Sequence, residues 1–202
     1  MISVLLNPFK FIAGIKSLIA GILIILTTAF IGYLSHTHFP DLISVKICPA
    51  FPLSYYIFQS LANWLVFSII LYIGTLIFSA SSVRLIDIIG TQALARTPYL
   101  IVSWIGFSNS LTLFSKYMLW KGLHYGNPVN LSIGDAITAV SMMILSLLTL
   151  IWMVTLMFSA FRVSANLKGT KSIILFIVVF IISMILTSMI SMHLLTIFNN
   201  NH

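Results

Sequence analysis

The sequence predicts an all-α protein, a polytopic transmembrane bundle of about five helices with its N-terminus inside and its C-terminus outside. The first observation behind this prediction is that 60% of the 202 residues are hydrophobic and only 6% are charged. A soluble domain carries about 25% charged residues, because its surface must face water. The second is a mean hydropathy of +1.13, in a chain whose charges lie between long apolar runs. Both observations are typical of a surface that faces lipid.

Five apolar runs are long enough to cross a hydrocarbon core of about 30 Å as helices. None of them contains Lys, Arg, Asp or Glu, and each such residue at a helix centre would cost about 2.5–3.5 kcal/mol on insertion scales. The third run is short and contains several Ser and Asn residues. We predict a single membrane domain, residues 1–202, with spans at residues 18–34, 57–78, 98–114, 136–160 and 172–197.

The orientation follows from the distribution of Lys and Arg, which are enriched on the cytoplasmic side of membrane proteins. With five spans, seven of these residues fall on the side of the N-terminus and three on the other side. The N-terminus is therefore expected inside. The seven are Lys10, Lys16, Arg84, Arg96, Arg162, Lys168 and Lys171, and the three are Lys46, Lys116 and Lys121.

Composition also limits the function. Ten Lys and Arg stand against three Asp and no Glu, but they lie singly or in small groups beside apolar runs, so we expect the lipid bilayer as a partner and no nucleic acid. No HExxH, G-x-S-x-G or Walker-type glycine loop is present. We therefore expect no enzyme activity, no catalytic residue and no cofactor. The single cysteine, Cys48, excludes an internal disulfide.

One short cluster resembles a set of metal ligands. His36 and His38 are followed by Asp41, and His124 and Cys48 could join them on the same outer face. Zinc needs three or four firmly held ligands, whereas these residues lie at the end of a predicted loop. We expect polar interfacial residues here and no metal site.

Small and hydroxylated residues recur at helical spacing in three of the spans. In lipid such residues let helices approach closely, so a packing seam is the first interpretation, and a polar wall along a pathway is the second. The residues are Ala13, Ser17 and Gly21 near the first span, Thr138, Ser141, Ser146, Thr149 and Ser159 in the fourth, and Ser183, Thr187 and Ser191 in the last.

Two amides are costly to bury in hydrocarbon without a partner. We expect Asn63 and Asn109 to face the interior of the bundle, where they could contact each other and, with Thr149, form an intramembrane polar site.

The loop after the second span has the most varied residues. Arg84 and Asp87 are three residues apart, as in an ion pair on one face of a helix. One interpretation is an amphipathic hairpin at the membrane surface. The other is a cytoplasmic docking surface made of Arg84, Asp87, Gln92 and Arg96.

Three segments resemble the Yip family, small five-span membrane proteins named for contact with Rab/Ypt GTPases. They are LNPFKFIAGIKS before the first span, GTQALARTPYLIVS with Arg96 and Pro98 at the third, and the stretch from Trp152 through FSAFRVSANLKGTKSIILF. A DLYGP-like motif does not precede the first span, so the chain is more similar to bacterial members. The resemblance implies a helical bundle without catalytic residues in the bacterial cytoplasmic membrane, or in an endomembrane if the chain is eukaryotic.

Two functions follow from these observations. The first is a non-enzymatic scaffold or membrane-organisation protein, which works through protein partners or a homo-oligomer and has no known small-molecule substrate. The alternative is a small transporter or permease component with a polar pathway between its helices.

Overall fold

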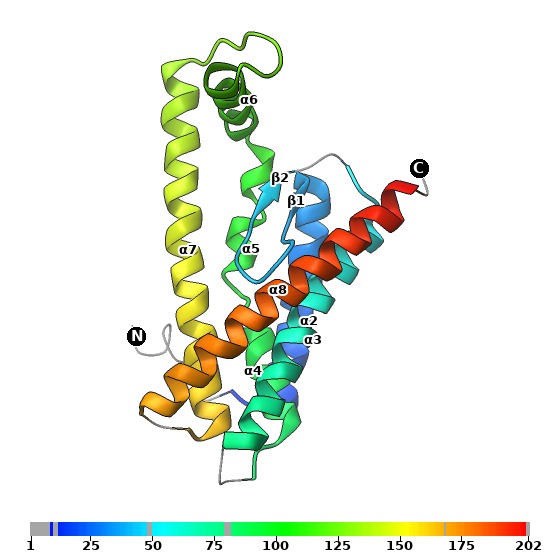
Figure 1. Cartoon of the computed structure of the whole chain (residues 1–202), viewed down its shortest axis with the longest axis vertical. Helices are drawn as coiled ribbons and strands as arrows, with labels where there is room; N and C mark the ends of the chain where they lie inside the picture. Colours follow the sequence, from blue (N-terminus) through cyan, green and yellow to red (C-terminus); the bar gives the residue numbers. More distant parts are fainter. Residues whose placement is uncertain (1–8, 10–11, 48–49, 79–81, 168, 201–202) are drawn as a thin grey trace.

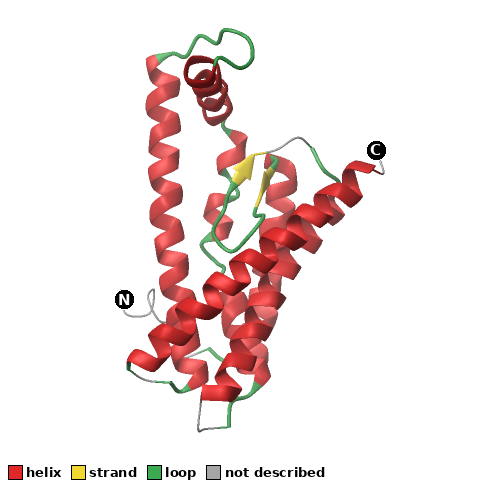
Figure 2. Ribbon diagram, viewed as in Figure 1, coloured by secondary structure: helices red, strands yellow, loops and turns green. Residues whose placement is uncertain are grey.

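The computed structural model describes residue 9 and residues 12–47, 50–78, 82–167 and 169–200. Most of these residues are helical, as Figures 1 and 2 show. The elements in chain order are α2 (Ile15–Ser35), β1 (Thr37–His38), β2 (Lys46–Ile47), α3 (Leu53–Phe78), α4 (Leu85–Leu94), α5 (Tyr99–Val102), the 3₁₀-helix η2 (Ile105–Phe107), α6 (Asn109–Leu123), α7 (Ile133–Ala165) and α8 (Thr170–Asn200).

Four helices are long and apolar enough to cross a membrane: α2, α3, α7 and α8. They contain the first, second, fourth and fifth predicted spans. At most a third of the most apolar part of each is buried inside the protein, and the exposed side chains on them are largely Ile, Leu, Val, Phe and Met. Such surfaces are stable in lipid and not in water. The chain is an all-α, multi-pass membrane protein.

The third predicted span, residues 98–114, is wrong as a single helix. Helix α4 ends before it, α5 has only four residues, and α6 begins after a break at Ser108. The first interruption occurs at Pro98, which has no N–H to donate to the carbonyl of Leu94. Tight turns replace the regular pattern there, with the N–H of Tyr99 3.0 Å from the carbonyl oxygen of Arg96. At the second interruption, Ser108 is extended and its hydroxyl accepts from the N–H of Ser110.

The interrupted segment still runs from one end of the bundle to the other (Figure 1). It starts with α4 at the end where α3 finishes, and it reaches η2 near the end of α2, where a Cβ on Gly106 would collide with the backbone of Ser35. Residues 85–107 rise about 1.5–2.0 Å each, so they extend for about 35–45 Å. The third crossing is therefore discontinuous, built from α4, α5 and η2.

Helix α6 lies at the far end of the bundle and is steeply inclined to α7, since it is seen almost end-on where α7 is seen along its length (Figure 1). None of its residues is buried. Lys121 donates to the hydroxyl of Tyr117 at 2.8 Å, and Trp120 packs beside that ring. Aromatic rings and lysines together are typical of the membrane–water interface. Residues 109–114 thus belong to an interfacial helix.

The centre of the molecule is α4, which packs against α2, α3 and α7. Its contact with α2 is made by small residues. A Cβ on Gly21 would lie 2.6 Å from the carbonyl carbon of Ala93, and one on Gly90 would lie 2.6 Å from the hydroxyl of Ser17. The two backbones can be this close only because these positions lack larger side chains.

The residues of the predicted packing seams differ in burial. Ser17 and Gly21 are buried, as are all three residues of the last seam, Ser183, Thr187 and Ser191, whereas Ala13 is exposed. In α7, Thr138 and Ser141 are exposed and donate to carbonyls of their own helix. These two residues therefore form neither a seam nor the wall of a pathway.

Candidate functional site

The chain between α2 and α3 folds back into the bundle. His36 takes a left-handed conformation, with φ of 57°, and the short antiparallel pair of β1 and β2 brackets a loop that reaches down between the helices (Figure 1). In this loop Phe39, Asp41 and Leu42 are all at least nine-tenths buried. Irregular backbone at such a position needs protein partners for its polar groups, because lipid offers none.

Side chains of the crossing segments supply those partners. Asn63 of α3 donates its amide hydrogens to the carbonyl oxygens of Phe39 at 2.6 Å and Asp41 at 3.2 Å. The hydroxyl of Tyr99, at the start of α5, donates to the carbonyl oxygen of Leu42 at 2.6 Å. Asn63 is buried, as its sequence predicted, and it holds the loop in place.

A second set of contacts joins the loop to α3 and α8. The Nδ1 of His38 is 3.3 Å from both the Tyr55 hydroxyl and the Gln59 amide nitrogen. Gln59 also donates to the hydroxyl of Ser191 at 2.6 Å. Burial lowers the pKa of His38 to about 4, against a hydrogen bond with Gln59 that raises it. The ring is therefore neutral at pH 7.

The predicted cluster of metal ligands is not brought together. His36 is exposed, whereas His38 is buried against α3. The carboxylate of Asp41 accepts from the N–H groups of Ile43 and Ser44, both at 2.8 Å. No group of three His, Cys, Asp or Glu residues that could hold a metal occurs in the part of the chain that the structure describes. Cys48 lies outside the described residues.

Arg96 is the one cation found inside the bundle among the described residues. It lies in the turn between α4 and α5 and is only 3% exposed. Its Nη2 donates to the backbone carbonyl oxygen of Asn63 at 2.9 Å, and its Nε has no hydrogen-bond partner. All three acidic residues of the chain lie in the described part, and none forms an ion pair with Arg96.

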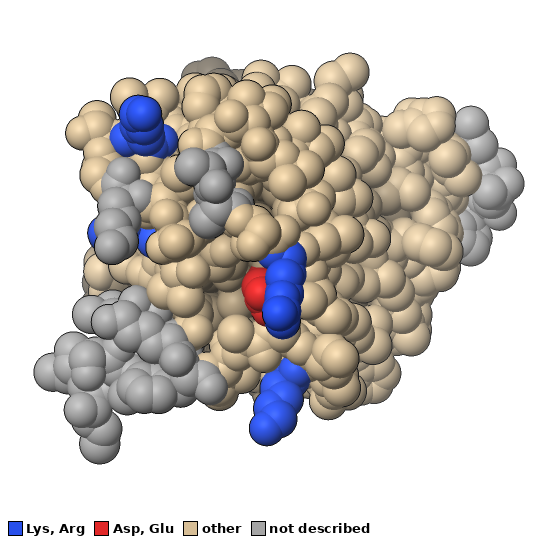
Figure 3. Space-filling model, turned by 90° about the horizontal axis from the view of Figure 1, so that it is seen from below, with Lys and Arg blue, Asp and Glu red and all other residues tan. Residues whose placement is uncertain are grey.

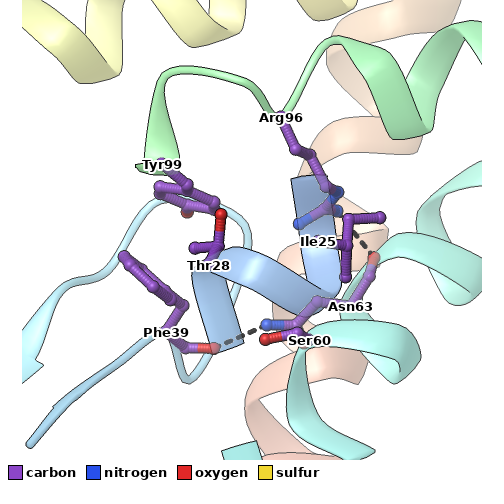
Figure 4. Close-up of a pocket in the computed structure, with 7 residues that line it drawn as sticks. All are labelled: Ile25, Thr28, Phe39, Ser60, Asn63, Arg96 and Tyr99. Carbon is purple, nitrogen blue, oxygen red and sulfur yellow. Dashed lines mark hydrogen bonds between the residues drawn. The ribbon is translucent and has the colours of Figure 1, made fainter. Parts of the chain in front are cut away.

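A cavity of about 10 Å³ adjoins this arginine, between α2, α3 and the α4–α5 turn (Figure 4). A volume of this size holds about one water molecule. The Thr28 hydroxyl is buried there without a hydrogen-bond partner. The residues that line the cavity are Ile25, Thr28, Phe39, Ser60, Asn63, Arg96 and Tyr99.

The predicted docking surface is wrong for two of its four residues. Gln92 is fully buried and donates to the carbonyl oxygen of Met157 at 2.9 Å, and Arg96 lies in the core. At the N-terminal end of α4, Arg84 is exposed and Asp87 is partly exposed. Figure 3 shows this end of the molecule, where separate Lys and Arg side chains stand on a mostly uncharged surface and acidic atoms touch one of them.

The predicted intramembrane trio of polar residues is also separated. Asn63 lies in the core, but Asn109 is exposed at the first turn of α6. Thr149 is buried in α7 and donates to the carbonyl oxygen of Leu145 in its own helix. Thr28, Ser60 and Tyr99 were not predicted from the sequence to lie with Arg96 at this cavity. The available signal was an arginine two residues before a proline at the start of an apolar run.

Comparisons with protein-family models, curated proteins and solved structures gave no match to this chain. The resemblance to the Yip family therefore stays a prediction. What the structure supports directly is a multi-pass helical membrane protein whose described residues place a buried arginine beside a small cavity lined by both apolar and polar side chains.

Proposed function

We propose that this protein is a membrane transport protein or permease component whose site is the polar centre around Arg96. The observation that carries the proposal is the burial of this guanidinium at the interruption of a crossing segment without a carboxylate partner. A charged residue inside a membrane bundle is costly, and where one occurs it commonly marks a path for a substrate or an ion.

The backbone around Arg96 supports the same function. A discontinuous crossing and a loop folded back into the bundle meet at this residue, joined by Asn63 and Tyr99. In many transporters the substrate site is formed where crossing helices are interrupted, because free backbone groups and helix ends are available there. Irregular backbone inside the membrane is tolerated where protein buries it or where it lines a cavity.

The distribution of charge supports an orientation with the N-terminus in the cytoplasm. Since Arg96 lies in the core, it no longer counts as a loop residue, which leaves six basic residues on the side of the N-terminus against three on the other. Cytoplasmic loops carry the larger number of Lys and Arg residues. Together with the resemblance to bacterial Yip proteins, this charge distribution supports a location in a bacterial cytoplasmic membrane, or in an endomembrane if the chain is eukaryotic.

The experiment tests whether water reaches the site. In a Cys48→Ser background, Thr28→Cys and Ser60→Cys place thiols at the cavity, and a membrane-impermeant thiol reagent is applied from each side of native membranes. There are two matched controls. Thr27→Cys places the thiol at the exposed residue directly before Thr28 in α2, and Ser183→Cys places it at a buried residue of α8 away from the cavity. A transporter opens its site to each side of the membrane in turn, and the thiolate that forms in contact with water attacks the reagent. Both cavity positions should therefore react about tenfold faster than both controls.

Reaction of neither cavity position above the controls, from either side, would contradict the transport function. The scaffold function would then be the better explanation, with Arg84 and Asp87 as what remains of its docking surface.

A further inference from the structure

We propose that the Arg96 cavity binds one small monovalent anion of the size of chloride. This inference rests on the proposed function and names the class of substrate for the same site. Three observations support it. The Nε–H of Arg96 and the hydroxyl of Thr28 have no hydrogen-bond partner, none of the residues that line the cavity is acidic, and the cavity is small.

Both groups that lack a partner at the cavity can donate. The Nε–H of Arg96 can only donate, and the hydroxyl of Thr28 can donate or accept. Each is buried, with Arg96 and Thr28 both 3% exposed. The hydroxyl group of Ser60 also lines the space. Two or three groups that can donate, in the lining of one small cavity, favour an acceptor as its occupant.

The positive charge of Arg96 favours an anion over a water molecule as that acceptor. A water molecule would satisfy the hydrogen bonds and leave the guanidinium without a counter-charge, which is costly in a bundle surrounded by lipid. None of the seven residues that line the cavity is acidic. These seven side chains therefore supply no negative charge, and a bound anion would.

The size of the cavity restricts the anion. Its volume of about 10 Å³ holds a single water-sized particle. The rings of Phe39 and Tyr99 stack with centroids 4.1 Å apart and form one wall. The amide hydrogens of Asn63 are used on the carbonyls of the loop, so this side chain does not widen the site by turning. A halide fits with small adjustments, whereas phosphate or a carboxylate ligand does not.

The test compares thermal unfolding of the purified protein in chloride and in gluconate at equal ionic strength, with binding of radiolabelled chloride measured on the same samples. The wild-type protein should bind chloride and unfold about 2–4 °C higher in chloride. Thr28→Val, which keeps the shape of the side chain and removes the hydroxyl, and Arg96→Gln should each remove most of the shift. Thr28→Ser should keep it.

The matched control is Thr27→Val, because the hydroxyl of Thr27 is exposed and bonds the carbonyl oxygen of Leu23 in its own helix. This variant should keep the full shift. Equal melting temperatures in the two salts, or a chloride shift that Thr28→Val and Arg96→Gln leave intact, would overturn the anion site. Cysteine labelling at the cavity without chloride binding would leave the transport function standing for another substrate.

Discussion

Helix α4 and the first half of α7 lie in the same bundle, yet nearly everything about their packing differs. Helix α4 is ten residues long, and half of it is buried against three other helices. In the first half of α7, between residues 133 and 150, only Ala139 and Thr149 are buried. Most of the other residues in that half are exposed, and the exposed ones are largely Ile, Leu and Met.

The difference shows what decides packing in lipid. Exposure of a large apolar side chain to lipid costs little, so the hydrophobic residues of α7 give no force toward the core. Burial of α4 depends instead on close approach at Gly90 and Ala93 and on hydrogen bonds from Gln92 and Thr91. In this protein close backbone approach and hydrogen bonds, and not a difference in apolar content, place α4 at the centre and the first half of α7 at the periphery.

The largest expected effect comes from closing the contact between α2 and α4. The methyl group of Gly21→Ala would overlap both the side chain and the backbone of Ala93, and we expect a loss of about 3 kcal/mol or more in stability. Thermal unfolding in detergent, followed by loss of monodisperse protein, measures it. The matched change is Gly122→Ala in α6, where nothing lies within 4 Å of the new methyl group.

In Gly122→Ala we expect no loss, and a gain of up to about 1 kcal/mol from the better helix propensity of alanine. A Gly21→Ala protein as stable as Gly122→Ala would show that the helices α2 and α4 are not in close contact.

The second effect concerns the loop held by Asn63. Asn63→Ala removes the donors to the carbonyls of Phe39 and Asp41 and leaves both buried without partners, at a cost of about 2–3 kcal/mol. Ser141→Ala is the peripheral counterpart, since this hydroxyl is exposed on α7 and bonds only its own helix. It should change stability by less than about 0.5 kcal/mol. Limited proteolysis within residues 36–47 is an independent measurement. Cleavage there should be faster in Asn63→Ala than in wild type, and Ser141→Ala should be cleaved at the wild-type rate.

The smallest effect is a dependence on pH. The pKa of His38 is about 4 in the folded protein, because burial disfavours the charged ring. The unfolded chain binds this proton already below about pH 6.5. Stability should therefore be complete well above pH 6.5 and should fall by about 2 kcal/mol as the pH decreases to 5, with the loss ending below about pH 4.

Comparison of His38→Gln with wild type in melting curves between pH 7 and pH 4 measures the contribution of this ring. The variant should lose less stability than wild type across the window, and His36→Gln, at an exposed position, should follow wild type. Identical slopes for His38→Gln and wild type would show that the ring is not buried as described.

The sequence by itself determined the membrane class of the protein and four of its crossings. Spans of more than twenty apolar residues without charge, as in α3 and α8, have no stable alternative to a helix in lipid. The burial of Asn63 and of the seam at Ser183, Thr187 and Ser191 also follows from local chemistry, because polar groups in such helices need protein neighbours.

Only the tertiary structure decided the third crossing and the site. From the sequence, residues 79–97 looked like a loop with an exposed docking surface, since they contain Arg84, Asp87 and Arg96. The structure places most of that segment in the centre, because Gly90 and Ala93 fit against Ser17 and Gly21 of α2. Contacts between residues so far apart along the chain depend on how the helices pack, and no local pattern records them. The same packing brings Arg96 beside Thr28, where neither residue alone would indicate a binding site.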